Sequence, residues 1–146
     1  MQVFRQIDPS AVMLAGWGVR VMLLAADDEE SAGQTAHRLA GLGGVVQCED
    51  DVFVALDAMI CNASGFGLFV VDCDPFGGLS AGHQILSMLR KGVADLPVIL
   101  ITADCGEQVF PTGLHDPIIL RAPLTAVSLR VGFEHAMRDR LIIPAA

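Results

Sequence analysis

Leu68-Phe69-Val70-Val71-Asp72 is a run of four apolar residues that ends in an aspartate. The residues that follow include Pro75 and two glycines, so the chain turns directly after the run. A short apolar run closed in this way predicts a strand that is buried on both faces. Asp72 would then lie at the carboxyl edge of a parallel sheet, where open α/β sheets bind their ligands.

A second acidic group closes an earlier apolar run. Residues 19–26 predict the first strand, and Asp27 and Asp28 follow it directly. If the two strands pair, carboxylates from both would meet at one edge, and like charges held close repel unless a cation lies between them. The pattern therefore predicts a Mg²⁺ site. Both residues would alternatively cap the first helix; we favour metal or phosphoryl chemistry for Asp27 and capping for Asp28.

The composition indicates one well-packed globular domain, because 53% of the 146 residues are hydrophobic and 18% are charged. The net charge of −8 argues against a nucleic-acid surface, which would need a basic stripe. No apolar run approaches the roughly 20 residues of a membrane span, and the N-terminus lacks the pattern of a signal peptide. The four cysteines form no CxxC pair and fit reduced thiols, so we expect a cytoplasmic protein with neither membrane nor nucleic-acid partners.

Short apolar runs alternate with amphipathic segments, which predicts a parallel sheet with helices on both faces. The expected strands cover residues 19–26, 45–48, 68–72, 96–102 and 116–121. The expected helices cover residues 29–41, a segment capped by Asp51, residues 80–92 and a segment from Thr125 to about residue 139. We expect residues 1–17 to be an irregular extension, residues 18–140 the folded domain, and residues 141–146 an apolar tail.

The connection between the last two strands departs from this alternation. Pro111 and two glycines within residues 103–115 leave no room for a full amphipathic helix. At most one turn would form, around residues 107–110. The fourth helix of the fold is therefore expected to be short or absent.

Four motifs follow one another along the chain, and each lies at a predicted strand end. In order, they carry an acidic cluster, an aspartate, a hydroxyl residue and a proline. They lie at residues 21–28, 68–72, 96–103 and 118–125. Together they resemble the receiver domain of two-component response regulators over about residues 19–138. The resemblance implies a doubly wound, flavodoxin-like α/β fold with five parallel strands in the order 2-1-3-4-5.

The resemblance also implies a function. Asp72 would accept a phosphoryl group, as an aspartyl phosphate, from a sensor histidine kinase or a phosphotransfer protein. Mg²⁺ would be held by Asp27, Asp72 and a backbone carbonyl near Asp74, with Asp28 as a weaker ligand. Thr102 would donate its hydroxyl to a phosphoryl oxygen. Such a domain is not an enzyme, and it would signal to a downstream protein by contact.

Two departures from the family's pattern support an alternative. Counting back from Pro123 places Ala122 where the family has a lysine, and the first acidic position falls on Ala26. Arg121 is the nearest cation, but adjacent strand residues point to opposite faces, so it would substitute only if the strand end is irregular. The alternative is a pseudo-receiver, a binding module that signals without phosphorylation.

A third reading comes from the enzymes. Asp72-Cys73-Asp74 matches the strand end of haloacid-dehalogenase-type phosphatases, with Asp72 as nucleophile and Asp74 as general acid. This reading fails on order, because those enzymes need a lysine after the threonine strand and Lys91 precedes Thr102.

For the receiver we expect a partner, or a homodimer, to dock on the fifth strand and fifth helix, where the apolar tail would add exposed hydrocarbon. The tail would alternatively fold back over the gap left by the missing helix.

Overall fold

A computed structural model describes residues 18–27 and 30–138 of the chain. Five parallel strands form one sheet in the order β2-β1-β3-β4-β5, which confirms the predicted topology. The strands are β1 (Arg20–Leu24), β2 (Val45–Glu49), β3 (Leu68–Asp72), β4 (Val98–Thr102) and β5 (Ile118–Arg121). The helices are α2 (Ser31–Gly41), α3 (Val52–Cys61), α4 (Leu79–Arg90) and α5 (Ala126–Ala136), with short 3₁₀ turns η3 (Ala63–Gly65) and η4 (Asp74–Phe76).

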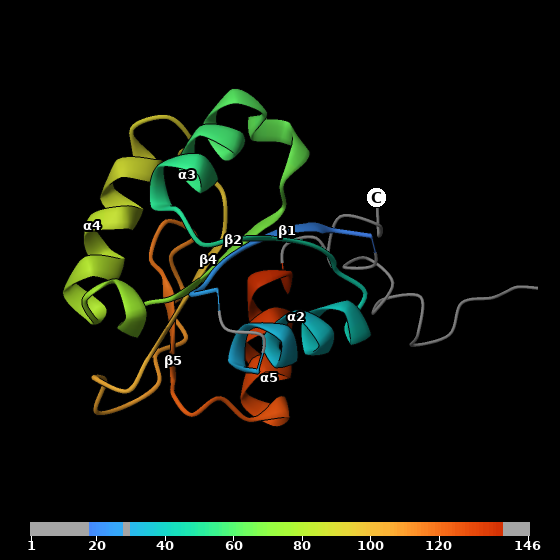
Figure 1. Cartoon of the computed structure of the whole chain (residues 1–146), viewed down its shortest axis with the longest axis vertical. Coiled ribbons are helices and arrows are strands. Elements are labelled where there is room, and N and C mark those ends of the chain that lie inside the picture. Colours follow the sequence, from blue (N-terminus) through green and yellow to red (C-terminus); the bar gives the residue numbers. More distant parts are fainter. Residues whose placement is uncertain (1–17, 28–29, 139–146) are drawn as a thin grey trace, which may run out of the picture.

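The helices cover both faces of the sheet, as repeated strand–helix units require. Helices α3 and α4 lie on one face, and α2 and α5 lie on the other (Figure 1). Asp51 and Thr125 cap α3 and α5 as predicted, because their side chains accept hydrogen bonds from backbone N–H groups of the first helical turn.

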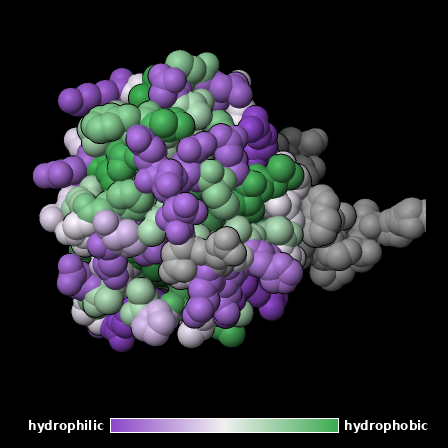
Figure 2. Space-filling model, viewed as in Figure 1, coloured by the Kyte–Doolittle hydropathy of each residue, from purple (hydrophilic) through white to green (hydrophobic). Residues whose placement is uncertain are grey.

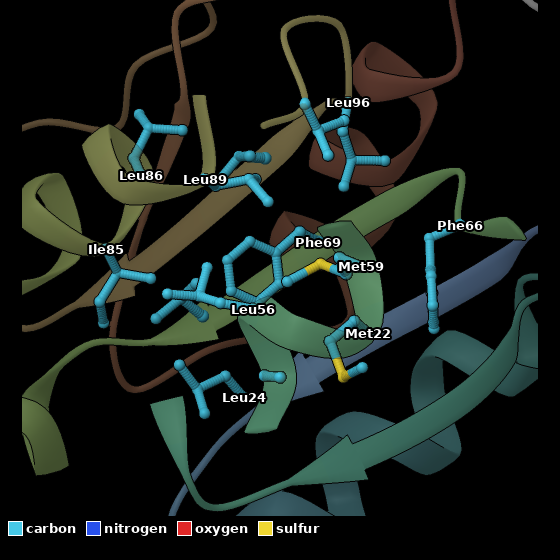
Figure 3. Close-up of a cluster of buried hydrophobic side chains, with 14 of the residues drawn as sticks. Met22, Leu24, Leu56, Met59, Phe66, Phe69, Ile85, Leu86, Leu89 and Leu96 are labelled. Carbon is cyan, nitrogen blue, oxygen red and sulfur yellow. The ribbon is translucent and has the colours of Figure 1, made fainter. Parts of the chain in front are cut away.

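The strands are buried on both faces because each helical layer seals its own apolar cluster. Phe69 of β3 is fully buried in the cluster under α3 and α4, and in Figure 3 its ring lies beside Leu56 and Met59 of α3. Val70, the next residue along β3, belongs to the opposite cluster under α2 and α5. This alternation sends Asp72 to the α2 and α5 side of the sheet.

Residues 103–117, which we call the β4–β5 segment, contain no helix although the structure describes all of them. Val109 instead forms an isolated antiparallel bridge with Ile119 on the outer edge of β5. Its N–H donates to the Ile119 carbonyl at 2.8 Å, and the Ile119 N–H donates back at 3.0 Å. The expectation of a short or absent fourth helix is confirmed.

Arg90, at the end of α4, ties this segment to the loop before β4. Its guanidinium donates to the carbonyl oxygens of Val93 at 3.4 Å, Leu96 at 2.8 Å and His115 at 3.1 Å. Burial lowers the pKa of this guanidinium, against the opposing effect of nearby carboxylates. The His115 ring nitrogen Nδ1 lies 2.7 Å from the Ala94 carbonyl and adds a second tie.

Helix α5 holds the same segment from the other side. Nε2 of His135 lies 2.6 Å from the Pro111 carbonyl, and the rings of His135 and Phe110 form a T-shaped contact. Arg138, just beyond α5, donates to the carbonyls of Pro111 at 3.4 Å and Thr112 at 3.0 Å. Side chains therefore satisfy carbonyl groups that a helix would have satisfied internally.

We expect Gly82→Ala to destabilise the protein by about 1–3 kcal/mol, because it overpacks the contact between α4 and Cys73, the residue after β3. A Cβ at Gly82 would lie 2.5 Å from Sγ of Cys73, a short buried side chain that cannot move away. Gly33→Ala in α2 is the matched control, since a Cβ there meets nothing within 4 Å. Urea unfolding should show Gly33→Ala as neutral or stabilising, and equal midpoints for the two variants would contradict the packing argument.

Several expectations fall on residues outside the described part of the chain. These are the irregular extension at residues 1–17, the tail at residues 141–146 and any role of Asp28. The domain boundaries at residues 18 and 140 likewise stay predictions. Among the described helices, none has the length and apolarity needed to cross a membrane.

Candidate functional site

Asp72 ends β3 at the carboxyl edge of the sheet and is half-buried. On one side it pairs in register with Ile101 of β4. On the other side Leu24 pairs with Val71, so the next residue of the chain, Ala25, comes level with Asp72. The residue beside the candidate nucleophile on the neighbouring strand is therefore an alanine.

A hollow of about 300 Å³ opens at Asp72, and we call it the Asp72 hollow. It is lined by Ala26, Ser31, Ala32, Asp72, Asp74, Pro75 and Ala122. Two of these residues are Ala122, which the receiver resemblance aligns with a lysine, and Ala26, which it aligns with a carboxylate. Methyl groups stand at both positions, so neither contributes a charge.

Asp74 also lines the Asp72 hollow, but its carboxylate is bound to the end of β4. Oδ1 accepts a hydrogen bond from the Thr102 hydroxyl at 2.7 Å, and Oδ2 accepts one from the Ala103 N–H at 2.9 Å. Oγ1 of Thr102 in turn accepts from the Asp104 N–H at 3.0 Å. Thr102 is fully buried and does not line the hollow, whereas Asp74 does.

Asp27 lies apart from this group. It is exposed and lines a neighbouring hollow of about 290 Å³ together with Cys48, Glu49 and Asp50 from the end of β2. The structure therefore brings Asp72, Asp74 and Thr102 to one edge but does not place Asp27 in the hollow that Asp72 and Asp74 share. The assignment of Asp27 and Asp72 as joint metal ligands stays a prediction.

The described residues of the Asp72 hollow do not fit a Mg²⁺ site of the expected kind. Mg²⁺ prefers oxygen ligands in near-octahedral geometry. Both carboxylate oxygens of Asp74 already accept hydrogen bonds from β4, and Ala26 offers no oxygen from its side chain. Within residues 18–27 and 30–138, no three side chains of His, Cys, Asp or Glu are grouped so as to hold a metal ion.

Two arginines are candidates for a substitute cation. The Arg121 guanidinium turns to the β4–β5 segment and donates to the Gly106 carbonyl, away from the Asp72 hollow. Arg38 of α2 lines a second hollow of about 230 Å³ that Asp72 also lines, and it donates to the Leu124 carbonyl at 2.9 Å. Sequence reasoning missed Arg38, because no spacing along the chain links α2 to the turn after β5.

Cys73, next to Asp72, is not a reactive thiol. It is fully buried under α4, where its Sγ lies 3.8 Å from the Val71 carbonyl. Burial above all, and the charges of Asp72 and Asp74 in addition, raise the pKa of the thiol to about 12, although a hydrogen bond with the Ile101 backbone opposes the shift. The nucleophilic thiolate is therefore scarce near pH 7.

No protein-family model matches the sequence, and no curated protein is similar to it in sequence. Solved structures do match its fold. A response regulator receiver domain protein from Clostridium thermocellum has a TM-score of 0.69 and 17% identity, over 86% of this chain and 98% of that one. The chain has the receiver fold.

Two further structures with the receiver fold agree with this assignment. A response regulator receiver protein from Sinorhizobium medicae has a TM-score of 0.65 and 20% identity, over 84% of this chain and 97% of that one. The receiver domain of a sensor histidine kinase from Pseudomonas aeruginosa has a TM-score of 0.63 and 18% identity, over 83% and 98% of the two chains. That domain is described with a magnesium ion coordinated in its active-site cleft. Identities this low establish the fold and leave the chemistry to the residues of the site.

Proposed function

We propose that this chain is a pseudo-receiver: a signalling module with the receiver fold that works by protein contact and does not depend on phosphorylation of Asp72. The observation that carries the proposal is the lining of the Asp72 hollow by Ala26 and Ala122. An incoming phosphoryl group brings negative charge to a carboxylate, and transfer requires nearby positive charge to offset it. Ala122 supplies no cation and Ala26 supplies no carboxylate to hold a metal ion, so we favour binding over phosphotransfer, and a signalling role over enzyme activity.

Phosphorylation is the second candidate, and two observations favour it. Asp72 keeps its position at the strand end beside an open hollow, and Arg38 lines another hollow with it. In this case Asp72 would take a phosphoryl group from a sensor histidine kinase or phosphotransfer protein, with Mg²⁺ from solution and Arg38 as the cation. We rank it second because the Arg38 guanidinium is held by the Leu124 carbonyl.

Treatment with acetyl phosphate and Mg²⁺ separates the two candidates. We expect the intact mass of the wild-type chain to stay unchanged, because the hollow lacks charge compensation at Ala26 and Ala122. NMR spectra with beryllofluoride and Mg²⁺ should likewise show no shift of the amides near Asp72. A phosphorylated product that Asp72→Asn abolishes would refute the pseudo-receiver and restore the phosphorylation reading, and Arg38→Leu would then test the cation.

We further propose that a partner or a second copy docks on the side of β5 and α5. Four apolar side chains are exposed there, and we call them the α5 face: Val109, Phe110, Val127 and Val131. Val127 and Val131 are one turn apart on α5, and Phe110 contacts His135 one turn further along. Apolar side chains that are exposed together, rather than singly, often mark protein contact sites. We also propose that the protein is cytoplasmic, because its four cysteines fit reduced thiols.

Sedimentation tests the α5 face. We expect the wild-type chain to self-associate and the double variant Val127→Lys/Val131→Lys to be monomeric, because two charges on the face oppose its burial. Phe53→Lys on α3 is the matched control, since Phe53 and Val127 are each 72% exposed. Apolar side chains also reach the surface in the upper part of Figure 2, where Figure 1 places α3. If only Phe53→Lys made the chain monomeric, the interface would have to be assigned to α3. A chain that ends at residue 140 tests any contribution of the tail.

A further inference from the structure

The carboxylate of Asp74 is held by two donors from consecutive residues of the chain. The Thr102 hydroxyl meets one oxygen at 2.7 Å, and the Ala103 N–H meets the other at 2.9 Å. Hydrogen bonds to an ionised carboxylate are stronger than neutral ones. The pair therefore joins the turn after β3 to the end of β4, and it does so through a negative charge.

The direction of the Thr102 hydroxyl is fixed by its own partners. The oxygen accepts the Asp104 N–H at 3.0 Å, and the side chain is fully buried, so its hydrogen has Asp74 as its acceptor. One anion thus organises three successive residues, Thr102, Ala103 and Asp104, at the point where the β4–β5 segment begins.

A group bound to Asp72 would enter a hollow that these donors do not line. Asp74 lines the Asp72 hollow, whereas Thr102 is fully buried and does not line it. A phosphoryl group on Asp72 would be an oxyanion in need of donors, and the hydroxyl and N–H at the end of β4 are already bonded to the Asp74 carboxylate. An internal anion thus takes the contacts that an added anion would otherwise make.

We propose that Asp74 is a built-in anion that sets the end of β4 and the start of the β4–β5 segment in one conformation, without a phosphoryl group on Asp72. The inference rests on the proposed function and explains how a pseudo-receiver would hold its docking surface ready. The β4–β5 segment carries Val109 and Phe110 of the α5 face, so a contact that fixes its first residues also helps to present that face.

The test is a pair of variants that make the same chemical change in the same hollow. Asp74→Asn and Asp72→Asn each remove one negative charge, and amide hydrogen exchange of the full chain is followed by NMR. We expect Asp74→Asn to speed exchange of the Ala103 and Asp104 amides by about tenfold, because these groups lose a charged partner or its support. Asp72→Asn should change the exchange rates of these two amides by less than about twofold. Asp74→Ala should accelerate their exchange more than Asp74→Asn does.

Exchange of the β1 amides in the same samples reports global unfolding. Acceleration of β1 equal to that at Ala103 would overturn the proposal, because Asp74 would then stabilise the whole fold and not this contact. The proposal would also be overturned if Asp72→Asn, and not Asp74→Asn, accelerated exchange of the Ala103 amide. Thr102→Val is a second probe, since it keeps the side-chain volume and removes the hydroxyl, and it should release the Asp104 amide, whose acceptor is lost.

The two proposals fail in different ways. A wild-type chain that is phosphorylated by acetyl phosphate refutes the pseudo-receiver, whatever the exchange rates show. Unchanged Ala103 exchange in Asp74→Asn refutes the role of Asp74 and leaves the pseudo-receiver standing.

Discussion

The double variant Ala26→Asp/Ala122→Lys is expected to become phosphorylated on Asp72 by acetyl phosphate in the presence of Mg²⁺. Both residues line the Asp72 hollow, so the substitutions add a carboxylate that can bind the metal ion and a cation that can offset the phosphoryl charge. Each missing electrostatic group of this kind typically costs a factor of about a hundred in rate. We therefore expect at least about a hundredfold faster incorporation than in the wild type, measured by intact mass.

The matched control places the same two side chains where they cannot reach the site. Ala40→Asp/Ala126→Lys makes the same chemical changes on the exposed surfaces of α2 and α5, and it should behave as the wild type. Adding Asp72→Asn to the Ala26→Asp/Ala122→Lys variant should abolish the mass gain. A folded double variant that takes up no phosphate would show that the two alanines are not what prevents the reaction, and it would leave the Asp74 contact as the stronger obstacle.

Arg90→Leu is expected to lower the free energy of unfolding by about 2–4 kcal/mol. The guanidinium donates to carbonyls of Val93, Leu96 and His115, and leucine leaves these acceptors without their charged donor. Leucine keeps much of the apolar contact of the arginine stem, so the loss reports the hydrogen bonds more than the packing. Urea unfolding followed by circular dichroism measures the change, with the slope of the transition as a check on two-state behaviour.

Arg130→Leu is the control for this prediction. Arg130 faces Glu134 at 3.3 Å on the exposed surface of α5, and exposed pairs of this type contribute about 0.5 kcal/mol or less. Near-equal losses in the two variants would mean that the Arg90 contacts do not hold the β4–β5 segment. A large loss for Arg90→Leu, with early exchange of the Val109 and Ile119 amides, would show that they do.

The sequence was sufficient to predict the architecture because local signals and burial agree. Strand β3 begins and ends at the predicted residues, and the caps Asp51 and Thr125 start α3 and α5 as predicted. The ends of other strands moved by a few residues, as for the expected strand at residues 96–102, which is observed as Val98–Thr102. Apolar runs identify buried strands well, but Leu96 and Pro97 lie outside β4, although the Pro97 carbonyl still accepts a hydrogen bond from the Phe69 N–H of β3.

The site was predicted less completely because it depends on register and on contacts between distant segments. A one-residue step along a strand moves a side chain to the other face. The strand pairing brings Ala25 level with Asp72, and Ala26 lines the hollow, while the assignment of Asp27 and Asp72 as joint ligands stays a prediction. The pairing of Asp74 with Thr102 joins residues 28 positions apart, and no periodicity in the sequence reports it.

The bridge between Val109 and Ile119 also decides how other chains can approach the sheet. β5 is an edge strand, and the N–H groups of Ile119 and Arg121 point outward from it. Val109 accepts the first at 3.0 Å, and the side chain of Gln108 accepts the second at 3.1 Å. An added strand would need these N–H groups as hydrogen-bond donors, and they are already bonded. Natural sheets use covered edges of this kind to prevent edge-to-edge association with other chains. Any partner of this edge must therefore be recognised through side chains, and aggregation by strand addition is blocked here by the segment that replaced a helix.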